Sequence, residues 1–267
     1  LFEIQGACIT CDAKNNLANY AAKKVIQKLN DVSNIHGIAI ASIKNCDHIG
    51  AVGIHGVNTQ IKNKLIFGFT NADALAVSPD GKNVVFGTNP ISLVMKIKGQ
   101  LTYIDLATTN FSMNKVKNFR RVNKNIPEDI ARDSDLNPTI DPFKASFLEP
   151  IGGHKGFALA LLVEILTSGL ANQNNSINLI PMYGTSLKEN RCVSHSFIVI
   201  DPIFMGEKSI DSLSSTIQNT IKNVSSYQAE LIPGIKEVRS KEKRLINGIP
   251  VDNSILKGWE QIGFIND

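Results

Sequence analysis

The stretch EPIGGHKGFALALLVEILTSGL, residues 149–170, does most to decide the fold class of this 267-residue chain. Its apolar part runs from Phe157 to Leu166, is interrupted by Glu164, and is well short of the roughly 20 residues that cross a bilayer. We therefore interpret 155–170 as a helix buried in the core of a globular protein. A nearly all-apolar helix among alternating elements indicates a layered α/β fold.

The segments before this helix alternate between two hydrophobic periods, which predicts helices and strands in turn. Apolar residues at four-residue spacing predict an amphipathic helix over 15–31, a second apolar periodic stretch covers 49–61, and basic residues dominate an exposed helix at 113–123. The turn signal Pro79-Asp80-Gly81 lies between the strands, and we expect a partly antiparallel sheet. Short, apolar runs place strands at 37–42, 65–70, 91–96 and 101–106.

The segments on either side of the apolar helix complete the expected architecture. Asn137-Pro138 and Asp141-Pro142 mark a long irregular loop, and a strand is expected at 196–201. Together these elements predict an α/β fold of three layers, α/β/α, with a mixed, partly antiparallel sheet. We assign 32–201 to a sheet domain supported by helical regions at 1–31 and 202–267, with helices near 209–226, 235–246 and 252–262.

Composition limits the possible partners and compartment. The 28 basic and 24 acidic residues give a net charge of +4, and the basic residues are scattered, so no nucleic-acid or membrane partner is indicated. Cys8, Cys11, Cys46 and Cys192 give no dense disulfide framework, and no secretory signal opens the chain, so we expect a cytoplasmic protein. The opening LFEIQG has the pattern of a strand that continues something upstream, and we expect that the sequence lacks its start.

Four segments place polar residues at element boundaries, where ligand sites usually form. They are KNCDHIG at 44–50, FGTNP at 86–90, IDLATT at 104–109 and IGGHKG at 151–156. No G-x-G-x-x-G follows a strand, so a standard Rossmann domain is not supported. In the first segment, His48 could donate or accept a proton near neutral pH, or could simply be hydrogen-bonded in a loop.

The other three segments also leave two interpretations open. Free backbone N–H groups and Lys155 of IGGHKG could face a phosphate, or its glycines could only allow a tight turn. In IDLATT, which contains Asp105, the hydroxyls of Thr108 and Thr109 suit a ribose, a phosphate or the cap of the next helix. Thr88 of FGTNP could be the polar anchor of a turn.

Two other kinds of chemistry are weakly indicated. The motif CITC at 8–11 suggests a redox or zinc site, but there is no second CxxC, and the other cysteines lack ligand-like spacing with the histidines. We therefore expect no metal. A hydrolase of the Ser-His-Asp type is not indicated, because there is no G-x-S-x-G elbow.

Six blocks taken in order resemble the malate/L-lactate dehydrogenase family of NAD(P)-dependent reductases. This family also includes sulfolactate, ureidoglycolate and cyclic-imine acid enzymes and is unrelated to classical malate dehydrogenases. The blocks are IKNCDHIGAVG at 43–53, FGTNP at 86–90, IDLATT at 104–109, IPEDIARDSDLNPTIDP at 126–142, EPIGGHKGFALALLVEILTSGL at 149–170 and PGIKEVRSKEKRLINGIP at 233–250.

The resemblance implies a non-Rossmann fold in which 32–201 binds NAD or NADP without the glycine fingerprint. It also implies an oxidoreductase that transfers a hydride between the cofactor and a small 2-hydroxy or 2-oxo acid, such as malate, lactate or sulfolactate, and forms a homodimer. His48 matches a catalytic histidine and Thr88 a threonine near the substrate. The expected cofactor contacts are Leu106, Ala107, Thr108, His154, Lys155, Gly156, Gly234, Ile235, Lys236 and Glu237.

The chain departs from the family pattern at two places. An upstream helical segment with S-H-G-x-x-R, whose His donates a proton and whose Arg holds the substrate carboxylate, is not in this sequence. Two tripeptides, Ser194-His195-Ser196 and Ile54-His55-Gly56, share letters with this motif, but neither lies in a helical segment at the start of the chain. The loops Asp73-Ala74-Leu75 and Pro127-Glu128-Asp129 replace proline- or aromatic-rich versions, so the substrate pocket is expected to differ.

Two alternatives to the dehydrogenase hypothesis therefore stay open. One is a catalytically degenerate relative, a cofactor-binding or structural protein that keeps the fold but lacks the proton donor and the residue that holds the substrate carboxylate. The other is a flavin or zinc protein, which only CITC favours.

Overall fold

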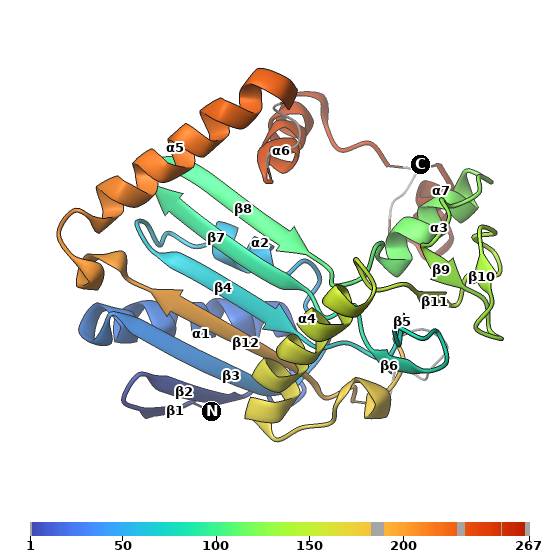
Figure 1. Ribbon diagram of the computed structural model, residues 1–267, viewed down its shortest axis with the longest axis horizontal. Helices are drawn as coiled ribbons and strands as arrows, with labels where there is room; N and C mark the ends of the chain where they lie inside the picture. Colours follow the sequence, from blue (N-terminus) through green and yellow to red (C-terminus); the bar gives the residue numbers. More distant parts are fainter. Residues whose placement is uncertain (1, 183–189, 229–232, 252, 265–267) are drawn as a thin grey trace. The chain divides into compact units, whose positions relative to one another are not determined.

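The structure, a computed structural model, describes residues 2–182, 190–228, 233–251 and 253–264 (Figure 1). The chain divides into two compact units after Ile217. The first unit holds both β-sheets and all four segments with boundary polar residues, and it is therefore the unit in which a site can be built.

The larger sheet has seven strands in the order β1-β2-β3-β12-β4-β7-β8. Within the described residues, β2 and β3 are the parallel pair of this sheet, and the other neighbours are antiparallel. This confirms the prediction of a mixed, partly antiparallel sheet. The strands are β1 (Phe2–Gln5), β2 (Cys8–Asp12), β3 (Ile38–Cys46), β12 (Val193–Ile200), β4 (Leu65–Thr70), β7 (Ile91–Ile97) and β8 (Gln100–Leu106).

Helix α1 (Ala18–His36) is the crossover that makes β2 and β3 parallel. Its apolar residues recur at three- and four-residue spacing, and Val25, Ile26 and Leu29 are fully buried against the sheet. The helix ends at Gly37, whose φ of 76° favours glycine and whose N–H donates to Ser33 O at 2.9 Å. The helix predicted over 15–31 is thus confirmed, with later bounds.

Helices cover both faces of the sheet (Figure 1). Helix α1 and the short helix α2 (Gly53–Val57) lie on one face, and α4 (His154–Glu164) lies on the other. Gly56 lets α2 approach β7, because a Cβ there would lie 3.0 Å from the Val94 side chain. The three-layer α/β/α architecture is therefore confirmed, although α2 is much shorter than the periodic stretch over 49–61.

Helix α4 continues into a π-helical turn, η1 (Ile165–Gly169), so the helix predicted at 155–170 is confirmed. Its interpretation as a buried core helix is wrong. The residues that face the protein are mostly small or polar, and include Ala160, Val163 and Glu164. The run is apolar on nearly all sides, so its sequence does not reveal which face packs. Large apolar residues left exposed are Leu159, Leu161, Leu162, Ile165 and Leu170.

A second, five-stranded sheet has the order β10-β9-β11-β5-β6. The long irregular loop that was predicted around Asn137 and Asp141 instead contains short strands, so that prediction was wrong in part. Two-residue strands have too few side chains to show a period of two. Helix α3 (Met113–Arg121) packs on this region through Val116. The strands are β5 (Ala76–Val77), β6 (Val84–Phe86), β9 (Ala131–Arg132), β10 (Pro138–Thr139) and β11 (Phe147–Leu148).

Two short 3₁₀ turns and three helices complete the part of the chain that the structure describes. No described helix is long and apolar enough to span a membrane. The expected domain boundaries at 31 and 201 stay a prediction, and two strands of the large sheet lie before the first of them. The helices predicted near the end of the chain are confirmed. These elements are η2 (Ser176–Asn178), η3 (Pro202–Met205), α5 (Ser209–Gln228), α6 (Ile235–Asn247) and α7 (Asn253–Gln261).

Candidate active site

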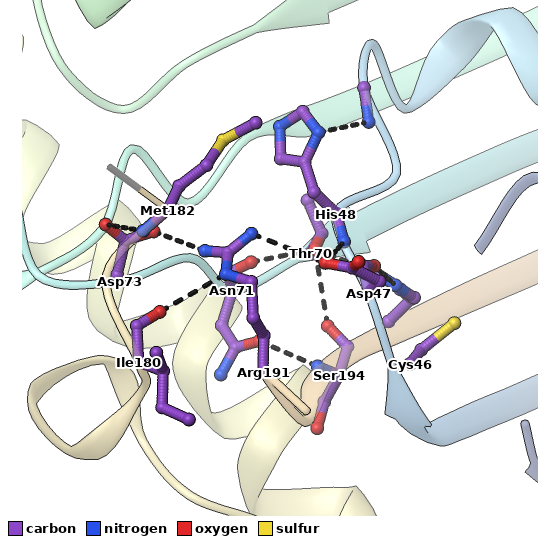
Figure 2. A network of polar contacts seen from close by, with 12 residues as sticks. Cys46, Asp47, His48, Thr70, Asn71, Asp73, Ile180, Met182, Arg191 and Ser194 are labelled. Carbon is purple, nitrogen blue, oxygen red and sulfur yellow. Dashed lines mark hydrogen bonds and ion pairs between the residues drawn. The ribbon is translucent and has the colours of Figure 1, made fainter. Parts of the chain in front are cut away.

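His48 lies on the loop that follows β3, and its imidazole is exposed (Figure 2). The backbone N–H of Gly50 donates to His48 Nδ1 at 3.2 Å. Since Nδ1 accepts this bond, the neutral ring carries its proton on Nε2. The loop therefore presents a ring nitrogen that bears a proton and points away from the loop backbone.

A partly buried arginine, Arg191, lies beside His48 (Figure 2). Arg191 Nη2 lies 2.6 Å from Asp73 Oδ1, and its Nη1 lies 3.5 Å from Asp47 Oδ1. Partial desolvation of the ring, and then the positive charge of Arg191, lower the pKa of His48, while the carboxylates of Asp47 and Asp73 oppose this shift. His48 is therefore mainly neutral near pH 7, and its protonated ring is a stronger acid than that of an ordinary histidine.

Three of the four segments expected to carry chemistry meet in one cluster. Thr88 O accepts from both Thr108 N at 2.9 Å and Thr108 Oγ1 at 3.0 Å. Thr108 O in turn accepts from Ile151 N at 2.9 Å. Gly156 packs against the same strand end, because a Cβ there would lie 2.6 Å from Thr108 O. The structure thus brings FGTNP, IDLATT and IGGHKG together.

The turn interpretation of IGGHKG is supported, and the expectation of free backbone N–H groups is wrong at three positions. The N–H groups of Gly153, Lys155 and Gly156 donate to carbonyls of the same loop at 3.1, 3.3 and 2.8 Å. The side chains of His154 and Lys155 are exposed at the start of α4, and its first turn holds no acidic residue. An anion at this loop would therefore be attracted mainly by the Lys155 ammonium group and the helix dipole.

The hydroxyls of IDLATT do not cap the next helix, so that interpretation is wrong. Helix α3 is capped by Ser112, whose side chain accepts from Lys115 N at 3.2 Å. Thr109 Oγ1 donates to Phe111 O at 2.7 Å, and the Asp105 carboxylate accepts from Gly53 N at 2.9 Å. Leu106 is exposed and Ala107 is partly exposed, so the strand end itself is accessible.

A buried carboxylate that the sequence analysis missed holds the site loops together. Glu164 Oε2 accepts from Asn89 Nδ2 at 2.9 Å and from Ser176 Oγ at 2.5 Å, and Glu164 Oε1 accepts from Ser168 Oγ at 3.0 Å and Asn71 Nδ2 at 3.5 Å. Asn71 directly follows β4, and Asn89 follows Thr88. The signal available in the sequence was the single charge inside the apolar run.

Several residues singled out in the sequence do not join this cluster. His55 lies in α2, with Nε2 3.1 Å from Ile49 O, and His195 is fully buried in β12. Gly234, Ile235, Lys236 and Glu237 belong to the second unit, whose placement relative to the first is not determined. Their roles stay predictions.

The cysteines give no support to a redox or metal site. Burial raises the pKa of the Cys11 thiol and raises that of Cys46 to about 12, so both thiols are protonated and unreactive. Across the residues that the structure describes, no group of three or more His, Cys, Asp or Glu side chains could hold a metal ion.

The whole first unit and part of the second resemble known proteins. A sequence profile described as malate/L-lactate dehydrogenase matches residues 1–259. An L-sulfolactate dehydrogenase of Methanocaldococcus jannaschii is 30% identical over 265 residues, which are 96% of this chain and 75% of that protein. A solved structure of a sulfolactate dehydrogenase from this organism has a TM-score of 0.83 at 28% identity, over 97% of this chain and 76% of the other.

Other relatives act with either nicotinamide cofactor, by their names. A ureidoglycolate dehydrogenase (NAD(+)) of Escherichia coli is 26% identical, over 91% of this chain and 71% of that protein. A (2R)-3-sulfolactate dehydrogenase (NADP(+)) of Chromohalobacter salexigens is 25% identical, over 91% and 72%. The structure of delta1-piperideine-2-carboxylate reductase from Pseudomonas syringae pv. tomato has a TM-score of 0.85 at 25% identity, over 98% of this chain and 79% of the other. The chain spans 64–75% of the length of the first three curated relatives.

Proposed function

Because the chain belongs to the malate/L-lactate dehydrogenase family, we propose that it acts as an NAD- or NADP-dependent oxidoreductase on a small 2-hydroxy or 2-oxo acid. The observation that supports this most is the cluster in which Thr88, Thr108 and Gly156 meet. Segments separated along the chain converge there, as a composite ligand site requires.

The residues of the cluster fit a nicotinamide dinucleotide. A Cβ added at Gly153 would meet no atom within 4 Å, so the surface over the loop is open. Lys155 beside it offers a positive charge to a phosphate, and the exposed strand end at Leu106 and Ala107 offers a contact surface. When bound, the cofactor supplies or accepts the hydride, and the protein orients it against the substrate. We assign His154, Lys155, Gly156 and Thr108 to its binding. For Gly234–Glu237 of the second unit, the family resemblance alone supports a role in cofactor binding.

His48 is assigned to proton transfer and Thr88 to contact with the substrate. During reduction, protonated His48 gives the Nε2 proton to the oxygen that develops negative charge on the substrate. During oxidation, neutral His48 takes up the hydroxyl proton. The lowered pKa makes the charged ring a stronger acid and keeps the neutral ring available near pH 7.

The direct test is oxidation of NADH and NADPH with a panel of 2-oxo acids. The assay compares the complete gene product with the 267-residue chain, and cofactor binding is measured in parallel by fluorescence. Turnover of at least one 2-oxo acid supports the proposal. Cofactor binding with no turnover in either protein favours the degenerate relative, and a yellow or zinc-containing preparation favours the third alternative.

Lys155→Met tests the anion-binding role of the loop before α4. We expect the Kd for NADPH to rise about 10- to 150-fold, because a charge-assisted hydrogen bond contributes about 1.5–3 kcal/mol. Lys28→Met is the matched control, because Lys28 is exposed on α1, on the opposite face of the sheet. Equal Kd values for the two variants, measured by titration calorimetry, would remove Lys155 from the cofactor site.

The exposed apolar face of α4 supports a homodimer. Leu161, Leu162 and Ile165 are 45%, 44% and 57% exposed, and a contiguous apolar patch commonly marks a protein interface. We expect Leu162→Glu to convert a dimer to monomers in sedimentation velocity, while Val122→Glu, a change at an exposed residue next to α3, leaves the dimer intact. A wild-type monomer would contradict the proposal. Cytoplasmic localisation is also proposed, and the cysteine pattern, which gives no dense disulfide framework, supports it.

A further inference from the structure

His195 is a buried polar residue to which the proposed function assigns no role. It lies in β12 beside Thr70 of β4, at the point where the pairing of β12 with β3 shifts register. Its ring is fully buried, yet both nitrogens have partners: Nδ1 is 2.7 Å from Thr70 Oγ1, and Nε2 is 3.0 Å from Asp47 O. Burial lowers the pKa of His195 to about 3, so the ring is neutral at any working pH.

The partners of His195 determine where its one proton lies. A carbonyl oxygen can only accept a hydrogen bond, so Nε2 carries the proton and donates it to Asp47 O. Nδ1 then has the lone pair that can accept the single hydrogen of the Thr70 hydroxyl, for which Asn71 O at 2.8 Å and Ser194 O at 3.3 Å compete as acceptors. The bond from Nε2 is therefore a directed contact between the core of the sheet and the loop after β3.

Asp47 connects this contact to His48. Its carbonyl is held inward by His195, and its carboxylate accepts from the backbone N–H of His48 at 2.6 Å. The other end of the loop is held by the bond from Gly50 N to His48 Nδ1. The direction of the His48 ring thus depends on the placement of the Asp47 peptide, for which the core provides His195 as the hydrogen-bond donor.

We infer that His195 is a positioning residue: its Nε2–H group fixes the Asp47 carbonyl and so aims the imidazole of His48 at the substrate. This inference rests on the proposed function, in which His48 transfers the proton. It adds a second histidine that acts only through the first. Misplacing a reacting group by about 1 Å can cost about 10²-fold in rate, so the effect of losing this contact is measurable.

Two amide substitutions separate this role from a general need for a polar residue in the core. In His195→Gln the amide nitrogen can take the place of Nε2 and still donate to Asp47 O. In His195→Asn the shorter amide reaches only the Thr70 side. We expect His195→Gln to keep kcat within about threefold, and His195→Asn to lower kcat about 10- to 100-fold with the Kd for NADPH unchanged. Equal kcat losses in both variants, or losses that follow the unfolded fraction, would overturn the inference.

The dependence on His48 is tested by combining the changes. In a His48→Gln background, His195→Asn should cause no further loss, because the two residues act as one unit. An additive loss contradicts the inference. If His48→Gln alone has no effect on kcat, the proposed role of His48 is wrong. Equal kcat losses in the two His195 variants would instead show that only the inference on His195 is wrong.

A measurement on the unmodified protein avoids any problem with folding of the variants. Two-bond ¹H–¹⁵N spectra should show His195 as the Nε2–H tautomer, with no titration between about pH 5 and 8, while His48 titrates with a pKa below that of an ordinary histidine. A His195 ring that carries its proton on Nδ1, or that titrates, would overturn the inference.

Discussion

His48→Gln is expected to lower kcat for 2-oxo acid reduction by about 10²–10⁴-fold, while the Kd for NADPH stays unchanged. Among the residues that the structure describes, Gly50 N donates to Nδ1 of the exposed ring, so Nε2 is the nitrogen that we assign to the substrate. His55→Gln is the matched control, because His55 lies in α2 and its Nε2 contacts Ile49 O of the loop before that helix. A His48→Gln enzyme with more than about a tenth of wild-type kcat would show that His48 is not the proton-transfer group.

The pH profile provides an independent check on the same residue. Oxidation needs neutral His48, so kcat/KM for oxidation should fall as the pH drops through its lowered pKa; reduction should fall as the pH rises through it. Arg191→Met removes the positive charge that disfavours protonated His48, so both limbs should move to higher pH. Limbs that stay in place would assign the titration to another group.

The sequence predicted a strand or helix correctly where the hydrophobic pattern within that one segment was sufficient to identify it. The strand at 65–70 was predicted with its observed bounds, because an apolar run with polar residues on both sides is complete within the segment. The buried face of α4 could not be predicted, because nearly every position of the helix is apolar. Which of its residues pack depends on partners such as Asn89, which is 75 residues away from Glu164 in sequence.

In the candidate site too, the sequence predicted the residues with a local signal and missed those whose role depends on contacts distant in sequence. His48, Thr88 and Thr108 were singled out because polar residues at strand ends are a local signal. His195 was given no role, because its tripeptide only shares letters with the family motif. Nothing near it in sequence shows that its ring reaches Asp47, 148 residues away. The loop glycines were correctly weighed as a possible turn, but only the structure shows that the turn uses its own N–H groups.

Gly156→Ala is expected to cause the largest loss of stability at the candidate site. A Cβ at this position would lie 2.5 Å from both Ile151 N and Ile151 O and 2.6 Å from Thr108 O. These are backbone atoms, so the clash cannot be relieved by a side-chain rotation. Forcing extra volume into such a contact costs about 1–3 kcal/mol, or about 2–12 °C in Tm for a chain of this size.

The same change should weaken cofactor binding, because the clash separates the two segments whose contact builds the cluster. Ile151 N donates to Thr108 O, and moving this bond shifts the loop that carries Lys155 relative to the strand end at Thr108. Gly169→Ala, at the other end of the same helix, is the control: its Cβ would meet only Glu164 O, at 3.7 Å, and helix propensity favours alanine. If the two variants have equal Tm and equal Kd for NADPH, the close contact at Gly156 has no structural role; if Gly156→Ala loses Tm but keeps cofactor affinity, the cluster supports the fold without forming the cofactor site.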